Sequence, residues 1–543
     1  MATVKADLVL RNGRIFLGLD HGHASALAVF RDRVLAVGDD AEIATLVGPA
    51  TRLIDLDGRA ATPGINDGHQ HMLSVGMALE EVDLRPARVR TLDDVLAAIA
   101  AKIAASPPGA WIFGGRYDHF HLDIGRHPFR EELDRVSPDN PVFIKRTCGH
   151  MGVANTRALA AAGIDEHAAN PPGGNIERQN GRLTGLLQER AQELVSKVMP
   201  ALPVDTLVGG IEAAGKLFLS QGITSVMDAA VGMRQGFDHY LAFSQARREG
   251  RMGVRVYLSF TGGPAGIEET ALANGLVTGA GDEMLKAGSV KLFTDGSAGG
   301  RTAAMRDPYR CSCGNTGMLL YEDADLDAFV DRYNRAGWQV SIHAIGDAAI
   351  DQALDAIERA DHHAPVAARR HRIEHCGFTT PDQIARMKRL GVIPAPQPIF
   401  IYEFGDLYID VLGEGRPSTS YPMRTWMAEG MHPIASSDAP VCDSNPMKNL
   451  YTMLTRKSDR GTVLGAGEAL SAEQAVSAMT FNGAYGSFSE HEKGTLAPGM
   501  LADIAVFDRD LFAVEPEAVL DAVADVTVVG GRVVHDRHGE VSG

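Results

Sequence analysis

The 543-residue sequence predicts an α/β protein: a (β/α)8 TIM barrel, a small β-sandwich domain formed by both chain ends, and an insertion after the first barrel strand. Three observations predict this fold. Short apolar stretches alternate with helical periods through the middle of the chain, as in parallel strands joined by helices. Both chain ends consist instead of short alternating segments separated by tight turns. Finally, about 140 residues separate the first two predicted barrel strands, which is too many for a plain loop.

The two chain ends are predicted to pair into one domain, residues 1–61 with 486–543. The N-terminal stretches ADLVLRNGRIF and SALAVFRDRVLAVG alternate apolar and polar residues around Asn-Gly and Gly-containing turns, which favours antiparallel hairpins over helices. The C-terminal stretches GTLAPGMLADIAVFDRD and VADVTVVGGRVVHDR show the same pattern. Neither end is long enough for a sizeable sheet of its own, so we expect them to share one.

The barrel is predicted to span residues 62–485. After a first strand that ends near His69, seven extended apolar segments are expected at 222–229, 254–260, 289–296, 339–346, 372–377, 392–398 and 433–440. Segments with helical periodicity, such as DAAIDQALDAIERA, lie between them. Eight strands that alternate with helices indicate a (β/α)8 barrel.

The long gap after the first strand is predicted to hold an insertion at residues 77–205. It contains strand-like runs of its own, GAWIFGGRYD and NPVFIKRTCGHM. We expect this insertion to shape substrate access.

Composition excludes several classes of protein. The formal net charge of -17 argues against nucleic acid or an anionic membrane as a partner. The N-terminus lacks the apolar core of a signal peptide, and no apolar run has the length of a transmembrane helix. The five scattered cysteines do not form a disulfide framework, so a cytoplasmic protein is expected. Cys311 and Cys313 form half of a zinc motif at most, with ordinary loop cysteines as the alternative.

Polar residues recur near the ends of the predicted strands. His69 and His71 are two residues apart, so on a strand they share a face and suit one metal ion. Alone this pair is a weak signal, common by chance. Lys291, His343, His375 and Asp438 follow near the ends of the fourth, fifth, sixth and eighth predicted strands. Because barrel active sites lie at the carboxyl ends of the strands, the ordered set is a strong signal.

This set resembles the amidohydrolase superfamily, and its local motifs resemble the YtcJ-like branch, which includes N-substituted formamide deformylases. The motifs are PGINDGHQH (63–71), CGHM (148–151), VKLFTDGS (290–297), HAIGD (343–347), RIEH (372–375), SDAPV (437–441) and GTLAPGMLADI (494–504). The resemblance covers nearly the whole chain. It implies a metal-dependent hydrolase with a barrel and a small β domain.

The resemblance also implies roles for individual residues. His69 and His71 would hold one divalent ion together with Asp438, whereas His343 and His375 would hold a second. Zinc is expected at an imidazole-rich site. A protonated Lys291 beside two cations would be unfavourable, and the family's solution is a carboxylated lysine that bridges both ions. The alternative is a structural lysine paired with a carboxylate such as Asp295.

Three further residues are candidates for substrate binding: His150 in the insertion, and Asp295 and Arg301 after the fourth strand. For each, an ordinary structural role is the alternative. Several aromatic residues are candidates for a substrate pocket, with packing of loops on the barrel as the alternative for most of them. They are Tyr117, Phe120, Phe400, Tyr402, Phe404 and Trp426.

The expected reaction is hydrolysis of a C–N bond in an amide, formamide or cyclic amide, by attack of metal-bound hydroxide. Asp438 is expected to act as general base and then general acid. An esterase or lactonase, a metal-dependent decarboxylase on the same barrel, and a binding module without activity remain as alternatives. The expected partners are a small amide-type substrate and a second copy of the chain, in a dimer.

Overall fold

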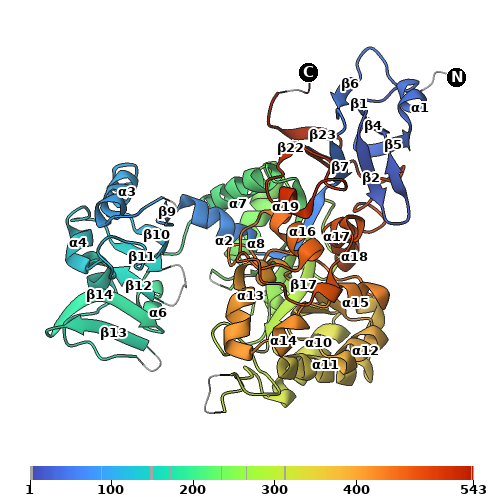
Figure 1. Ribbon diagram of the computed structural model, residues 1–543. Coiled ribbons are helices and arrows are strands. Elements are labelled where there is room, and N and C mark those ends of the chain that lie inside the picture. Colours follow the sequence, from blue (N-terminus) through green and yellow to red (C-terminus); the bar gives the residue numbers. More distant parts are fainter. Residues whose placement is uncertain are drawn as a thin grey trace. The chain divides into compact units, whose positions relative to one another are not determined.

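The computed structural model describes residues 4–86, 88–146, 151–171, 174–233, 235–264, 266–310, 314–539 and 541. The chain divides into two compact units, one of Met1–Val75 with Ile211–Gly543 and the other of Gly76–Gly210. Figure 1 shows the elements of each unit. In the described ranges, no helix is both long and apolar enough to cross a membrane.

The larger unit contains a seven-stranded parallel sheet whose strands neighbour one another in chain order. Its strands are β8 (Ile65–Gln70), β15 (Ile223–Val231), β16 (Arg255–Thr261), β17 (Leu285–Phe293), β18 (Gln339–Ala344), β19 (Arg372–His375) and β20 (Ile393–Ala395). All nine residues of β15 are buried, as expected where helices cover a parallel sheet. Six of these strands overlap the segments predicted from 222 onward.

The predicted eighth strand, 433–440, closes the barrel without regular strand geometry. Ile434 N donates to Pro394 O at 3.0 Å on one side, and Asp438 N donates to His69 O at 2.8 Å on the other. His71 N completes the closure by donating to Ala439 O at 2.8 Å. Because a proline has no N–H to donate, the prolines at both ends of this segment leave the ladder incomplete.

Helices connect and surround these strands (Figure 1). They are α2 (Met72–Glu80), α7 (Val204–Leu219), α8 (Asp238–Arg248), α9 (Glu268–Ala273), α10 (Asp323–Arg335), α11 (Asp347–Asp361), α12 (Pro381–Leu390), α13 (Ile399–Leu412), α14 (Gly415–Ser418), α15 (Met423–Ala428), α16 (Pro446–Thr455), α17 (Ala472–Ala478) and α18 (Phe481–Gly486). Helix α12 shows how the sequence sets such bounds. Thr380 and Gln383 form a capping box at its start, and Gly391, with a φ of 68°, ends it.

Both chain ends build a β-sandwich of two sheets within the same unit, as predicted. One sheet has the order β5 (Arg33–Gly38), β4 (Ala26–Phe30), β1 (Leu8–Arg11), β6 (Arg52–Asp55). The other has the order β23 (Arg532–Asp536), β22 (Ala524–Val529), β21 (Ile504–Phe507), β7 (Ala60–Pro63), β2 (Arg14–Gly18), β3 (Gly22–Ala24). The short helices are α1 (Asp40–Ala44) and α19 (Pro516–Val519).

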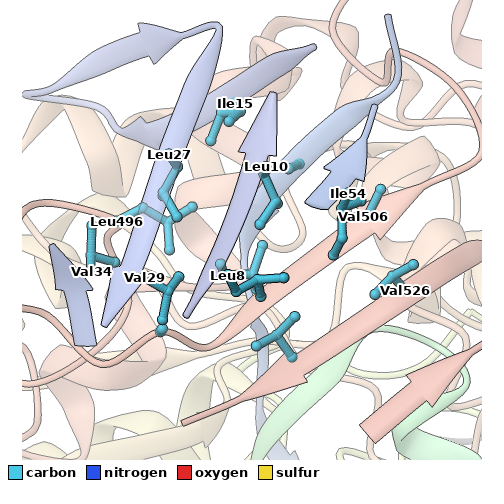
Figure 2. Close-up of a cluster of buried hydrophobic side chains, with 14 of the residues drawn as sticks. Leu8, Leu10, Ile15, Leu27, Val29, Val34, Ile54, Leu496, Val506 and Val526 are labelled. Carbon is cyan, nitrogen blue, oxygen red and sulfur yellow. The ribbon is translucent and has the colours of Figure 1, made fainter. Parts of the chain in front are cut away.

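One hydrophobic core lies between these sheets. Leu8, Leu10 and Leu27 of the first sheet pack in the same cluster as Val506 and Val526 of the second (Figure 2). The N-terminal and C-terminal strands therefore bury one another's apolar faces, which neither end offers enough surface to do alone.

The smaller unit is the insertion and has a mixed sheet of its own. The order is β13 (Gly174–Gln179), β14 (Arg182–Glu189), β12 (Met151–Ala154), β11 (Val142–Arg146), β10 (Ile112–Tyr117), β9 (Val82–Asp83). Its helices are α3 (Leu92–Ala104), α4 (Arg130–Asp134), α5 (Thr156–Ala161) and α6 (Gln192–Ser196). The two strand-like runs of the predicted insertion are β10 and β11. Its role in substrate access stays a prediction.

Candidate metal centre

The six predicted ligands lie at or near the carboxyl ends of the barrel strands. His69 is the second-last residue of β8, and His71 directly follows that strand. Lys291, His343 and His375 lie on β17, β18 and β19. Asp438 lies on the segment that closes the barrel. Parallel strands bring these ends to one end of the barrel, so His71 and Asp438, 367 positions apart in the chain, come within 3.1 Å of each other.

His69, His71 and Asp438 form a compact group. One potential ligand atom of each residue lies within 4.8 Å of the others. Asp438 Oδ1 is 3.1 Å from His71 Nε2 and 3.5 Å from His69 Nε2. Burial by itself would raise the pKa of Asp438, but the hydrogen bond to His71 and the nearby positive charges bring that pKa below its usual value. An ionised carboxylate therefore faces two imidazoles.

His343 and His375 continue the group. Their ring centroids are 4.3 Å apart, and the centroid of His375 is 4.9 Å from that of His69. His375 and Asp438 both adopt left-handed backbone conformations, with φ of 69° and 56°. Non-glycine residues rarely adopt such angles, and they do so most often at functional sites. The turn at His375 breaks the strand alternation, so its ring joins the site although the preceding Glu374 already contacts His69.

In three of these histidines, one of the two ring nitrogens lies against a hydrogen-bond acceptor. His69 Nδ1 contacts the buried carboxylate of Glu374, and His375 Nδ1 lies 2.6 Å from Gln397 Oε1. These acceptors place the ring proton on Nδ1. Nε2 of both rings is then unprotonated, and its lone pair can bind a metal ion. His343 is the reverse case, because its Nε2 lies 3.1 Å from the carbonyl oxygen of Gly296. That contact leaves Nδ1 of His343 free.

Lys291 is buried in this cluster with 1% of its surface exposed. Across the described ranges, no hydrogen bond or ion pair joins its Nζ to another residue. The ring of Phe293 lies beside Nζ, with its centroid 5.0 Å away. Burial lowers the pKa of Lys291 to about 8.

The alternative partner, Asp295, directs its carboxylate elsewhere. It accepts hydrogen bonds from Ala304 N, Ile345 N and Gly346 N at 2.9–3.0 Å. The carboxylate of Asp295 therefore contacts backbone amides and His343, and not Lys291. A substrate contact by Asp295 stays a prediction.

The other predicted substrate residues are placed less fully. Arg301 is exposed in the loop after β17, with a φ of 56°, and its substrate role stays a prediction. His150, Cys311 and Cys313 lie outside the described residues. Among the aromatic candidates, Tyr117 and Trp426 are fully buried, which is the packing alternative. Phe400 is also buried, and its ring stacks on His375 at 6.0 Å.

Sequence reasoning missed the side chains that hold the ligands. Arg372 Nε donates to Glu374 Oε1 at 2.7 Å, and its Nη2 donates to Gly68 O at 2.7 Å. Asp228, at the end of β15, accepts from Leu73 N at 3.2 Å at the start of α2, and burial raises its pKa to about 6. The charged pair within the fully buried β19 was a usable signal for Arg372 and Glu374. No local signal identified Gln397 or Asp228.

The donor set suits a divalent ion such as zinc, which binds imidazole nitrogen and carboxylate oxygen. Buried free nitrogens on three histidines, each with an oriented ring, are the second requirement of such a site. Lys291 fits only as a neutral or anionic group, because a buried ammonium would repel a cation.

Comparison with known proteins agrees with this reading of the residues. The model of the amidohydrolase family matches residues 52–535. The chain belongs to the amidohydrolase family. The chain is 30% identical to the protein LONG AFTER FAR-RED 3 of Arabidopsis thaliana, over 98% of this chain and 92% of that protein.

Two bacterial relatives confirm the predicted branch. The putative amidohydrolase YtcJ of Bacillus subtilis is 27% identical over 97% of this chain and 99% of its own. The N-substituted formamide deformylase of Arthrobacter pascens is 28% identical over 94% of both chains. A solved structure, an uncharacterized metal-dependent hydrolase from Pyrococcus furiosus, is 29% identical with a TM-score of 0.77, covering 93% of this chain and 99% of that chain. This likeness confirms the fold class.

Proposed function

We propose that this protein is a metal-dependent hydrolase that cleaves a C–N bond of an amide-type substrate. The observation that carries the proposal is the convergence of four imidazoles, an ionised carboxylate and a buried lysine at the carboxyl ends of the barrel strands. Two similar proteins support it by name, a metal-dependent hydrolase and an N-substituted formamide deformylase.

His69, His71 and Asp438 would hold one ion, and His343 with His375 would hold a second. Lys291 would be a further ligand in its carboxylated form. Carbon dioxide reacts with a neutral amine, and the lowered pKa of Lys291 favours that neutral form. A bound divalent ion would supply polarisation of the substrate carbonyl and a lowered pKa for water.

Asp438 is the group that moves the proton. Its lowered pKa keeps the carboxylate ionised at neutral pH, so it can accept a proton from water as the water oxygen bonds to the carbonyl carbon. The same carboxyl then gives that proton to the nitrogen as the C–N bond breaks.

The proposal is tested by removing the metal and restoring it. Protein stripped with a chelator should lose hydrolysis of N-formyl amines and related amides and regain it with Zn²⁺. Asp438→Asn, which keeps the size of the side chain but cannot take the proton, should lower kcat by about 10²–10⁴-fold. A panel that adds lactones and aromatic acids separates amide hydrolysis from the esterase and decarboxylase alternatives. Full activity of demonstrably metal-free protein would contradict the proposal.

A further inference from the structure

Asp295 is a buried loop residue of this site whose carboxylate accepts several backbone hydrogen bonds. It follows β17 by two residues and has only 2% of its surface exposed. One carboxylate oxygen, Oδ2, accepts from Ala304 N at 3.0 Å and from Gly346 N at 2.9 Å. The other, Oδ1, accepts from Ile345 N at 3.0 Å. One side chain thus ties the loop after β17 to the end of β18 and the start of α11.

The same Oδ1 lies beside the ring of His343. The distance from His343 Nε2 to Asp295 Oδ1 is 3.2 Å, and the distance to Gly296 O is 3.1 Å. Both neighbours of Nε2 are acceptors, so the ring proton belongs on Nε2. Nδ1 is then the nitrogen that remains to bind a cation.

We propose that Asp295 is a positioning residue that fixes the orientation and tautomer of His343, and that occupancy of the ion position formed by His343 and His375 depends on it. This inference rests on the proposed metal centre. It also gives Asp295 a role other than the predicted substrate contact.

The dependence should be selective, because the other histidines have separate tethers. His69 is held by Glu374, which Arg372 holds in turn at 2.7 Å. His375 is held by Gln397, whose amide nitrogen donates to Ser436 Oγ at 3.0 Å. None of these contacts passes through Asp295. Loss of its carboxylate should therefore leave the position formed by His69, His71 and Asp438 intact.

Metal counting on the full-length protein tests the selectivity. Wild type, Asp295→Asn and Asp347→Asn are equilibrated with buffered Zn²⁺, and bound metal is measured by mass spectrometry beside circular dichroism. Asp347 is the matched control: a half-buried carboxylate at the same end of α11 that accepts Arg306 N at 2.7 Å. We expect two ions in wild type and Asp347→Asn, and at least a 10-fold weaker second ion in Asp295→Asn.

Two outcomes of the count overturn the inference: unchanged affinity for both ions in Asp295→Asn, or equal weakening of both ions in folded protein. Failure of the proposed function looks different, since wild type would then bind no zinc at all.

A second measurement does not depend on the Asp295 variant. Nitrogen-15 NMR of histidine-labelled, metal-free wild type reports which nitrogen of His343 carries the proton, with His343→Gln used to assign the signal. We expect a protonated Nε2 and an unprotonated Nδ1. A proton on Nδ1 overturns the inference, whatever the metal count.

Discussion

Glu374 shows how one residue prepares another for binding. Its carboxylate contacts His69 Nδ1, and Arg372 fixes that carboxylate from the other side. A carboxylate behind a ligating histidine orients the ring and raises its basicity. Both members of the pair are completely buried, with 1% or less of each side chain exposed.

Replacing Glu374 by glutamine should weaken metal binding while it preserves the packing. The amide keeps an oxygen near Nδ1 but loses the charge, so affinity for the first ion should fall about 10–100-fold. Competition with a chromophoric chelator measures this affinity. The matched control is Glu490→Gln, which removes a carboxylate that pairs with Arg370 at 2.7 Å and lies beside His491 rather than beside His69. Equal affinities in both variants would contradict the role of Glu374.

Lys493 provides a test of electrostatics away from the site. Its Nζ donates to Ser225 Oγ at 2.7 Å, and burial lowers its pKa to about 7. In the unfolded chain the pKa is about 10.4, so the unfolded state binds more protons between these values. The loss of folding stability that comes from burying the charged Lys493 is therefore complete below about pH 7, and it shrinks as the pH rises toward about 10.

Lys493→Met should accordingly stabilise the protein more near pH 6 than near pH 9, where part of the penalty is already gone. Urea unfolding at the two pH values measures the difference. Lys388→Met, at a lysine with 55% exposure, is the control and should show little pH dependence. A pH-independent effect of Lys493→Met would contradict the account.

At the residue scale, the positions of the six candidate ligands near strand ends were predictable, and the side chains that contact them were not. His69, His71, Lys291, His343, His375 and Asp438 recur at strand ends, a pattern that sequence order preserves. Gln397, between β20 and α13, contacts His375, and Asp228 on β15 accepts from Leu73 N. Only the closed barrel brings them near. Asp295 was visible in its motif, but its three backbone partners depend on loop geometry that no local pattern encodes.

The element that matters most for the site is the irregular eighth segment. It passes between β20 and β8, and its hydrogen bonds to His69 O and from His71 N hold the two ligands against Asp438. The apolar pattern of 433–440 predicted its place correctly. Its strand hydrogen bonding is incomplete because its prolines have no N–H to donate. Which hydrogen bonds are lost depends on the neighbouring strand, which the sequence does not identify.

Gly68 tests the fit between this segment and β8. A methyl group at Gly68 would overlap Cγ2 of Ile434, which is fully buried. Gly68→Ala should lower the free energy of unfolding by about 1–3 kcal/mol through overpacking, and it should weaken zinc binding because His69 is adjacent. Gly209→Ala is the control, since no atom lies within 4 Å of its added methyl. A Gly68→Ala protein as stable as wild type would show that the segment is not packed as described.

At the scale of the whole molecule, the sandwich is fastened to the barrel inside one unit. Arg255 at the start of β16 binds Asp503, just before β21, through contacts of 2.7 and 3.0 Å. Only 5% and 4% of these side chains are exposed. Removing one partner of a buried pair leaves the other charge buried without a partner, which destabilises the fold.

Asp503→Ala should therefore lower the free energy of unfolding by about 3–5 kcal/mol, whereas the double variant Arg255→Met with Asp503→Leu should recover much of the loss. Urea unfolding measures both. Glu429→Ala, which breaks the exposed pair of Glu429 with Lys388, should cost about 0–1 kcal/mol. A cost for Asp503→Ala as small as that of the exposed pair would contradict this account.

The alternation of segments sufficed to predict the architecture, including the domain shared by both chain ends. Periodicity identifies elements, and the pairing of the ends followed from the need to bury two small apolar faces. The precise domain bounds, the dimer and the cytoplasmic location stay predictions. The role of the insertion in substrate access also stays a prediction.

The central claim is that His69, His71 and Asp438 bind a divalent ion, with a second ion at His343 and His375. Anomalous diffraction at the zinc edge, from crystals grown with Zn²⁺, tests it most directly. The account predicts an anomalous peak about 2.0–2.2 Å from the nitrogens of His69 and His71 and from an oxygen of Asp438, and a second peak beside His343 and His375. A map without a peak, in which Asp438 still holds His71 by a hydrogen bond, would contradict it.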